Sequence, residues 1–428
     1  MAASNRTTST NTGQMKTYYN NVFLEKFKES LVMGQFVDIK SIPLHAGKLV
    51  DWMRYYNVDI TTTPITEGSA TANQVDVTEQ NVQATVKKYA EWAQMTEFLK
   101  LTARDPNLEG WVELFGQAAA ETTDLLLMTE AAYRGSLPIR ADELATNSTH
   151  TMEGIVDSSS NNSTTRFIDA SLDDGTNDWW NGGHFCLYGR DVQSGVTYGN
   201  NYGFGGRIQD FSANATTGSL RYVDITTADV SSETALATWA SGGKYRIVQT
   251  EDLTNATSNG TLSGNAVRYA VSRLETLNNY RFGGGFYHGV LCPETKYDLA
   301  QDTVVTAMLE YKDSDKTGYN YVINEVWGVR WFMTSKPYRE ASGAKSAAVD
   351  YAATGTVFGT PIMGRHALGR VDLGAMGAAD IIMKNPGPQD TSQPYNEWGT
   401  IAYRMYMVAK ALNAAFAVML YSGATGQV

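Results

Sequence analysis

The hydrophobic and polar positions of the chain predict a helix first and extended structure after it. In residues 18–36, Phe23, Phe27 and Leu31 recur every four positions, the period of one face of an amphipathic helix. The preceding residues 1–15 are polar and rich in Ser, Thr and Asn. We expect that segment to be disordered or to lie against a partner.

A period of two follows, and it predicts two long strands. The stretch LVDWMRYYNV after Lys48 is rich in β-branched and aromatic residues, and further on Val82, Ala84 and Val86 alternate with polar residues. The segment TTTPITEGSATANQ between them is polar and turn-rich. The pattern predicts a two-stranded arm, which is too extended to be stable in isolation and is expected to lean on another surface.

The strongest helical pattern lies in residues 105–135. Asp105 and Pro106 are typical of a helix start, and Gly135 is typical of a helix end. The predicted apolar face has six positions, with Phe115 as the alternative at the second: Trp111, Leu114, Ala118, Leu125, Met128 and Ala132.

Residues 141–265 differ in composition from the rest of the chain. They are loaded with Gly, Ser, Thr, Asn and Asp, and short strand-like pieces such as GHFCLYG and KYRIVQT interrupt the polar loops. This pattern predicts a compact, inserted β-rich domain. The glycine cluster Gly203, Gly205 and Gly206 lacks the spacing of a dinucleotide-binding fingerprint and is interpreted as a loop.

Helices and strands are mixed in the last third of the chain. AVRYAVSRLETLNN and ETKYDLAQD predict helices, whereas FYHGVLCP, NEVWGVRWFMTSKP and GTVFGTPIMGRHALGRVDL predict strands. Because no strand–helix–strand rhythm repeats, the fold class is predicted to be α+β.

One of the most apolar stretches, residues 403–424, lies near the C-terminus. It cannot comfortably span a bilayer, because Arg404 and Lys410 interrupt it and the uncharged remainder is too short. Its alternating pattern predicts two antiparallel strands that are joined near Asn413 and buried on both faces.

The charge and the cysteine content of the chain argue against several classes of protein. The formal net charge is −11 and the pI is about 5.0. This balance argues against a dedicated nucleic-acid-binding protein, whose surface would carry a basic stripe. The two cysteines, Cys186 and Cys292, make neither a disulfide framework nor a zinc site. The polar N-terminus does not resemble a signal peptide, so synthesis in the cytosol is expected.

Motifs that carry chemistry are few. The five histidines are scattered without ligand spacing, and neither a Gly-x-Ser-x-Gly elbow nor a P-loop occurs. We therefore expect no catalytic residue, no cofactor and no metal. One acidic cluster offers oxygen ligands for calcium, although the same residue types are typical of turns, so calcium binding stays open. Its members are Asp169, Asp173, Asp174, Asn177 and Asp178.

Three stretches together have the order and spacing of one protein family. They are KTYYNNVFLEKF…GQF…IPLHAGKLVDWMRY, then TTTPITEGSATANQVDVTEQNVQATVKKYAEWAQMTEFLKLTARDP, and finally VFGTPIMGRHALGRVDLG…MKNPG…NEWGTIAYRMYMVAKALNAAFAVMLYSG. In this combination the chain resembles the major capsid proteins of tailed bacteriophages with the HK97-type fold, in the family of N-four-like phages. Residues 141–265 have no counterpart in this resemblance.

The resemblance implies an HK97-type capsid fold of class α+β with an inserted β-rich domain. The expected boundaries are 1–45 for the N-terminal arm, 46–100 for the extended β-hairpin loop, 101–140 for the spine helix and peripheral domain, 141–265 for the insertion, 266–375 for the axial domain and 376–428 for the closing strands of the peripheral domain.

The resemblance also implies a function without catalysis. The chain would self-assemble, as pentamers and hexamers, into an icosahedral head around a double-stranded DNA genome. Implied partners are the packaged DNA, bound without sequence specificity, a scaffolding protein and a portal, with no membrane, and whether a decoration protein binds stays open. The implied location is the virion, after assembly in the host cytoplasm. Lys–Asn cross-links between subunits and a maturation cleavage stay open.

Contacts between subunits are expected in the extended arm. The candidate residues are Trp52, Tyr55, Thr66, Glu67, Gly68, Lys87 and Lys88. The alternative function is a β-rich surface protein that binds glycans through the insertion, where Trp179, Trp180 and Trp239 could stack on sugar rings. Packing of these aromatic residues in a small β-sheet core is the competing interpretation.

Overall fold

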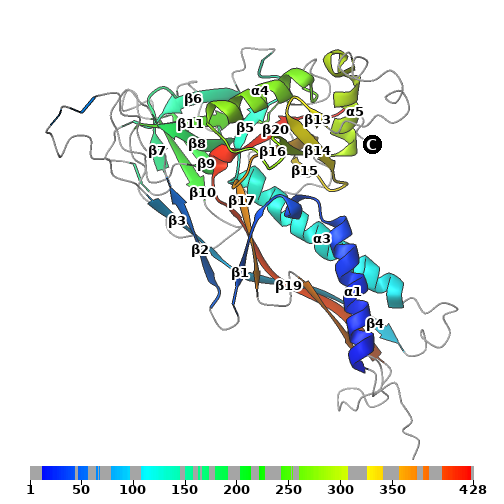
Figure 1. Cartoon of the computed structure of the whole chain (residues 1–428). Helices are drawn as coiled ribbons and strands as arrows, with labels where there is room; N and C mark the ends of the chain where they lie inside the picture. The colour runs from blue at the N-terminus through cyan, green and yellow to red at the C-terminus, as the bar shows by residue number, and fades with distance from the viewer. Residues whose placement is uncertain are drawn as a thin grey trace, which may run out of the picture.

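The computed structural model describes most of the chain as three large sheets, one two-stranded hairpin and the helices packed on them (Figure 1). The described residues are 12–43, 47–55, 64–65, 67, 79–96, 108–144, 150–157, 162–163, 166–172, 179–190, 203–213, 221–226, 242–251, 253, 260–306, 325–340, 356–373, 379–384 and 398–425.

The long helix α3 (Leu108–Tyr133) connects the two largest parts of the fold. Its first half packs with α1 (Thr12–Ser30) on a five-stranded sheet, and its second half packs on a seven-stranded sheet. Figure 1 shows α1 lying across the outer half of α3. The two helices approach closely at Gly116, where a side chain would meet the carbonyl oxygen of Phe23 at 2.8 Å.

The predicted apolar face of the first helix is confirmed, since Phe23, Phe27 and Leu31 are buried. The helix begins earlier than predicted, so residues 12–15 are helical and not disordered. Residues 1–11 lie outside the described residues. A short 3₁₀ turn, η1 (Met33–Gln35), follows the helix.

The predicted face of α3 is right near its end and wrong near its start. Met128 and Ala132 are buried, but Leu114 is 66% exposed. Phe115, the alternative at that position, packs against the core because the sheet lies on its side of the helix. The predicted helix start at Asp105 and Pro106 lies outside the described residues.

The five-stranded sheet is organised around one 14-residue strand. Its order is β1-β17-β19-β18, and β4 also pairs with β19. The pair β1–β17 is parallel, and the other pairs are antiparallel. The strands are β1 (Asp38–Ile42), β4 (Lys87–Thr96), β17 (Leu368–Leu373), β18 (Ala379–Lys384) and β19 (Trp398–Ala411).

The base of the predicted arm is confirmed as an antiparallel hairpin of β2 (Leu49–Tyr55) and β3 (Glu79–Thr85). Strand β4, which the alternating pattern predicted as part of the same arm, leaves the hairpin and joins the five-stranded sheet. Of the predicted tip, the structure describes only residues 64, 65 and 67.

The seven-stranded sheet is buried on both faces. Its order is β13-β14-β12-β16-β20-β5, with β15 paired to β16. Helix α4 (Gly264–Thr276) covers one face and the second half of α3 covers the other. A further helix, α5 (Pro293–Gln301), follows β12. The strands are β5 (Leu137–Arg140), β12 (Tyr287–Leu291), β13 (Glu325–Val326), β14 (Val329–Met333), β15 (Tyr338–Glu340), β16 (Val357–Met363) and β20 (Ala417–Ser422).

The prediction of an antiparallel pair at the C-terminus is wrong in its pairing. Both strands exist, as β19 and β20, but they belong to different sheets. A 3₁₀ turn, η2 (Ala414–Phe416), starts after Asn413 and redirects the chain from one sheet to the other. The alternating pattern determined which side chains share a face, but it held no information on the partner strand.

Residues 141–265 are β-rich as predicted and form a six-stranded antiparallel sheet with the order β6-β11-β8-β9-β10-β7, and their origin as an inserted domain stays a prediction. We keep the name insertion for this segment. The strands are β6 (Thr151–Ile155), β7 (Arg166–Ile168), β8 (His184–Arg190), β9 (Phe204–Ala213), β10 (Arg221–Thr226) and β11 (Gly243–Val248). The interpretation of the glycine cluster as a loop is wrong, because Gly205 and Gly206 lie within β9.

The α+β class is confirmed, and the helix, hairpin, long helix, insertion and closing strands follow one another in the order that the resemblance implied. The sheets nevertheless cross the expected domain boundaries. Strand β17, expected in the axial domain, pairs with β19. Strand β20, expected among the peripheral strands, pairs with β16.

Candidate functional site

One face of the β2–β3 hairpin packs on its own chain. Val50 of β2 is buried against Val371 and Val408 of the five-stranded sheet. Trp52 is partly buried beside them. Trp52, which was expected at a contact between subunits, therefore contributes to a core within its own subunit.

The opposite face of the hairpin is open and carries large apolar side chains among polar neighbours: Asp51 lies between them on β2, and β3 presents Glu79, Asn81, Gln83 and Thr85 opposite them. Alternate residues of a strand point to opposite faces, so Leu49, Met53 and Tyr55 lie together on the side away from the five-stranded sheet. Their side chains are 51%, 57% and 66% exposed. Three large apolar side chains on one short strand are thus exposed to solvent. Tyr55 is among them, and its contact with another subunit stays a prediction.

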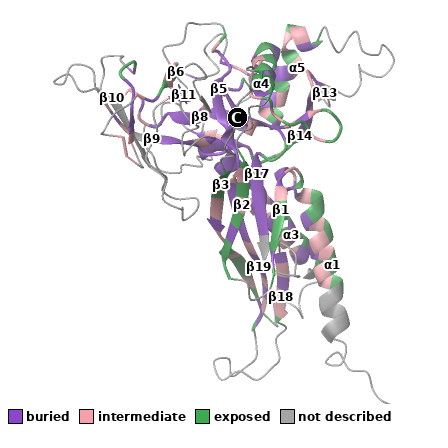
Figure 2. Ribbon diagram, turned by 60° about the vertical axis from the view of Figure 1, so that its left-hand side comes forward, coloured by how far each residue is buried: buried purple, intermediate pink, exposed green. Residues whose placement is uncertain are grey.

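The five-stranded sheet also has one covered and one open face. Ile401, Tyr403 and Met405 of β19 point toward α1 and α3 and are buried. On the other face, the hairpin covers the end of β19 around Val408 (Figure 2). Trp398 lies at the opposite end of β19 and is 49% exposed.

A row of apolar side chains crosses the uncovered end of that face. Trp92 of β4 pairs with Ala402 of β19, and Ala402 pairs with Ile382 of β18. Residues directly opposite one another point to the same side of a sheet. Trp92 is 67% exposed. We name Trp92, Ile382, Trp398 and Ala402 the open-face cluster.

The other candidates of the arm are placed as follows. Lys87 and Lys88 are exposed at the start of β4, opposite Met407 and Tyr406. Glu67 is exposed at the tip. Thr66 and Gly68 lie outside the described residues.

The tryptophans of the insertion give no support to a glycan site. Trp180 is 3% exposed and belongs to the core of the six-stranded sheet, so its proposed stacking on a sugar is wrong. Trp179 is partly buried against the same core and packs at 5.5 Å from the ring of His150. Trp239 lies outside the described residues.

The acidic cluster of the insertion is represented by one residue. Asp169 is buried and accepts hydrogen bonds from the hydroxyl groups of Tyr245 and Ser171. The other four members lie outside the described ranges. Within those ranges, no three His, Cys, Asp or Glu side chains are grouped so that they could hold a metal ion. No helix of the described residues is long and apolar enough to cross a membrane.

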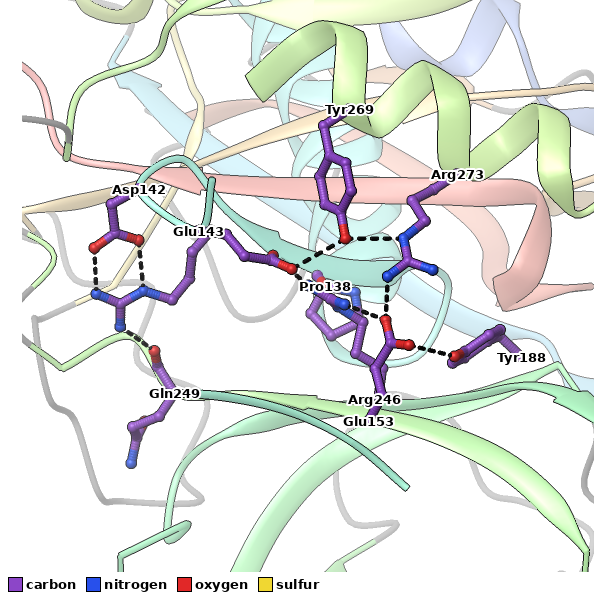
Figure 3. A network of polar contacts seen from close by, with 10 residues as sticks. Pro138, Asp142, Glu143, Glu153, Tyr188, Arg246, Gln249, Tyr269 and Arg273 are labelled. Carbon is purple, nitrogen blue, oxygen red and sulfur yellow. Dashed lines mark hydrogen bonds and ion pairs between the residues drawn. The ribbon is translucent and has the colours of Figure 1, made fainter. Parts of the chain in front are cut away.

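An ion network fastens the insertion to the rest of the fold (Figure 3). The buried guanidinium of Arg246, on β11, binds Glu143 and Glu153 and donates a hydrogen bond of 2.8 Å to the carbonyl oxygen of Pro138. Arg273 of α4 binds the same Glu153. The network therefore ties the six-stranded sheet to β5 and α4.

A second buried cluster lies where the insertion meets the seven-stranded sheet and α3. The carboxylate of Glu340 contacts the His184 ring at 2.9 Å and accepts a hydrogen bond of 3.0 Å from the hydroxyl of Tyr338. Arg207 is 4.0 Å from the same oxygen. Burial raises the pKa of Glu340, but His184 and Arg207 outweigh this effect and hold the pKa at about 2. The junction thus contains an ionised carboxylate with partners from β8, β9 and β15.

Sequence reasoning missed the open-face cluster and both ion clusters. In KKYAEWAQMT, Trp92 alternates in phase with Lys88, Gln94 and Thr96, and a large aromatic residue in this mostly polar phase of a strand was the available signal. The ion clusters gave no such signal, because their members are far apart in the sequence.

Comparisons with known proteins give similarity in structure alone. No family model matches the chain, and no curated protein sequence matches it. The capsid of Ralstonia phage GP4 is similar with 12% identity and a TM-score of 0.49 over 93% of each chain. The capsid structure of the cyanophage P-SCSP1u has 11% identity and a TM-score of 0.48 over 92% of this chain and 89% of that one. The cyanophage Pam1 capsid has 11% identity and a TM-score of 0.47 over 95% of this chain and 93% of that one.

Proposed function

We propose that the chain is a structural subunit that self-assembles into the icosahedral head of a tailed bacteriophage. The observation that carries this proposal is the apolar surface that one copy leaves open. The open-face cluster and the outer face of the hairpin expose five large apolar side chains on the three strands β2, β4 and β19: Leu49, Met53, Tyr55, Trp92 and Trp398. Large exposed apolar patches of this kind mark protein–protein contacts.

The occupant of these surfaces is a second copy of the chain. Trp and Tyr at the centre of an interface contribute a large share of the binding energy. Tyr55 on the hairpin of one copy and Trp92 on the sheet of the next supply such residues on both sides of one contact. Repetition of a contact between two different patches builds a ring, and pentamers and hexamers are the rings of an icosahedral shell. The sequence resemblance to phage capsid proteins supports the same arrangement.

The remaining roles follow from this assembly. The net charge of −11 suits a shell that confines DNA without binding it tightly, so packaged DNA is a non-specific partner. A scaffolding protein, a portal and a decoration protein are the further proposed partners. The proposed location is the virion, after assembly in the host cytoplasm. No step of this role requires a catalytic residue, a cofactor or a metal.

Electron microscopy and sedimentation of the expressed full-length chain test the proposal. We expect shell-like particles, tubes or isolated rings from the unchanged chain. Trp92→Glu places a charge in the contact and should reduce the yield of assemblies about tenfold or more, since each 1.4 kcal/mol of lost contact energy is a factor of ten. Tyr55→Glu should act in the same direction.

Ile155→Glu is the matched control, because Ile155 is an apolar residue that is 38% exposed at the end of β6, on a different sheet. Its assembly should equal that of the unchanged chain. A chain that stays monomeric under every condition contradicts the proposal. If Ile155→Glu and Trp92→Glu lose assembly equally, the open-face cluster is not the basis of the proposed assembly.

A further inference from the structure

The glycine cluster of the insertion lies at a junction of four parts of the molecule. Gly203 directly precedes β9, and its carbonyl oxygen accepts a hydrogen bond of 2.8 Å from the amide of Ala414 in η2. The amide of Gly205 donates to the carbonyl oxygen of Arg134, just after α3, at 3.2 Å. The insertion, the turn between the two large sheets and the end of α3 therefore meet at these glycines.

The hairpin supplies the fourth part through Arg54 of β2. Its Nη1 donates a hydrogen bond of 2.9 Å to the carbonyl oxygen of Leu412 and lies 3.5 Å from the carbonyl oxygen of Gly203. The positive charge of Arg54 also acts on Cys186 of β8. Burial raises the pKa of the Cys186 thiol, and the charges of Arg246 and Arg54 oppose that rise. Arg54 is thus a cation on the hairpin whose partners lie on other elements.

Only glycine fits at position 203. Its φ of +72° is in the left-handed region, which side chains rarely adopt. A Cβ atom there would be 2.7 Å from Nη1 of Arg54 and 2.4 Å from Oδ1 of Asn413. The neighbouring Gly205 would place a Cβ 2.9 Å from the carbonyl oxygen of Arg134. The glycines therefore allow the hairpin cation and the turn to approach the backbone of the insertion.

The turn itself is held from several sides. The amides of Leu412 and Asn413 donate to the carbonyl oxygen of Ala367 at 2.9 and 3.2 Å. The carboxylate of Glu130 on α3 accepts a hydrogen bond of 3.0 Å from the amide of Ala411. Because these hydrogen bonds hold the turn in place, the bond from Arg54 to Leu412 links the hairpin to a fixed part of the fold.

We propose that Arg54 is a positioning residue that couples the direction of the β2–β3 hairpin to the insertion sheet through the carbonyl oxygens of Leu412 and Gly203. A shift of the hairpin then changes the contacts at Gly203, and a shift of β9 changes the direction of the hairpin. The coupling is a property of the single chain and goes beyond the proposed assembly. The coupling can be absent in a chain that still assembles, and it can be present in a chain that does not assemble.

Amide hydrogen exchange of the unassembled full-length chain, followed by mass spectrometry, tests the coupling. Gly203→Ala adds a Cβ atom that meets both Arg54 and the side chain of Asn413, without changing the hairpin sequence. It should displace Arg54 and speed exchange in β3 about three- to tenfold, the effect of losing one or two hydrogen bonds. Arg54→Ala should speed exchange of the amides around Ala414 by a similar factor. Arg54→Lys retains a donor and should restore part of the protection.

Gly243→Ala is the control, since the atoms nearest to its Cβ belong to the side chain of Leu187 within the insertion. It should leave β3 unchanged. The double variant of Arg54→Ala and Gly203→Ala should exchange no faster in β3 than the faster single variant, because both remove the same link. The proposal is overturned if the effects of the two single variants on exchange in β3 add fully in the double variant. It is also overturned if Gly203→Ala does not change exchange in β3.

Exchange of α3 and β20 reports whether each variant is folded. If Gly203→Ala loses protection there too, the comparison of Arg54→Ala with Arg54→Lys at the amides around Ala414 decides the question. Equal exchange of those amides in both variants and in the unchanged chain overturns the coupling. Faster exchange in Arg54→Ala with partial recovery in Arg54→Lys supports it.

Discussion

The five-stranded and seven-stranded sheets of this protein are built on the same helix but are completed in different ways. The seven-stranded sheet lies between α4 and the second half of α3, and its strands β16 and β20 are buried at every position. The five-stranded sheet has α1 and α3 on one face only, so β19 alternates between buried and partly exposed residues. The seven-stranded sheet is covered on both faces within one chain, and the five-stranded sheet has one face that is partly open to solvent.

This difference separates stability from assembly. Residues of the seven-stranded sheet should determine the free energy of unfolding of the single chain, because their contacts form on folding. Residues of the open-face cluster should affect it little, because Trp92 and Trp398 stay largely in water in the folded single chain. Substitutions in the two sheets can therefore distinguish the two properties.

The largest effect is expected at the ion cluster on the edge of the seven-stranded sheet. Glu340→Gln removes the charge that compensates Arg207, and losing one partner of a buried ion pair costs about 3 kcal/mol or more in the free energy of unfolding. Urea unfolding of the unassembled chain measures this. Glu325→Gln is the control, because Glu325 pairs with Arg330 at a partly exposed position where such a pair contributes about 1 kcal/mol or less.

The same substitution has a defined pH dependence. The pKa of Glu340 falls from 4.5 to about 2 on folding, so the folded state binds this proton less readily than the unfolded state. The stabilisation is fully present above about pH 4.5 and is lost as the pH falls toward about 2. The stability difference between the unchanged chain and Glu340→Gln should shrink as the pH falls from about 4.5 toward about 2. A difference that grows in acid would contradict the assigned charge.

A slightly smaller effect is expected inside the seven-stranded sheet. Leu420 of β20 is fully buried in the core beneath α4. Leu420→Ala should lower the free energy of unfolding by about 3 kcal/mol, through lost burial and the cavity left behind. Leu49→Ala makes the same change on the open face of the hairpin and should have a much smaller effect. Equal losses at both positions would show that the hairpin face is covered within the single chain.

The smallest effect on the single chain is expected at the open-face cluster. Trp92→Ala should change the free energy of unfolding by no more than about 0.5 kcal/mol, because the side chain is largely in water. Its effect should appear only when assembled particles are disrupted with urea. A loss of several kcal/mol in the unassembled chain would contradict the division between the two sheets.

Local patterns predicted the elements well and their partners poorly. Period-four spacing located the buried face of α1 around Phe23 and Phe27, and period-two spacing located the hairpin of β2 and β3. The same kind of pattern failed at Leu114, where a helix that serves two sheets has apolar residues around much of its circumference. The candidate surface was only partly predicted: Tyr55 is exposed as expected, but Trp52 faces inward and Trp92 was missed.

The sequence by itself determined the α+β class, the long helix, the β-rich insertion and the alternation of faces in the closing strands, because each depends on neighbours within about ten residues. Only the tertiary structure decided that β19 and β20 enter different sheets, that Gly203 lies beneath Arg54 and that Glu340 meets His184. Strand pairing and buried ion contacts join residues that are far apart in the sequence. Their choice depends on how whole surfaces fit together, and no local period encodes that fit.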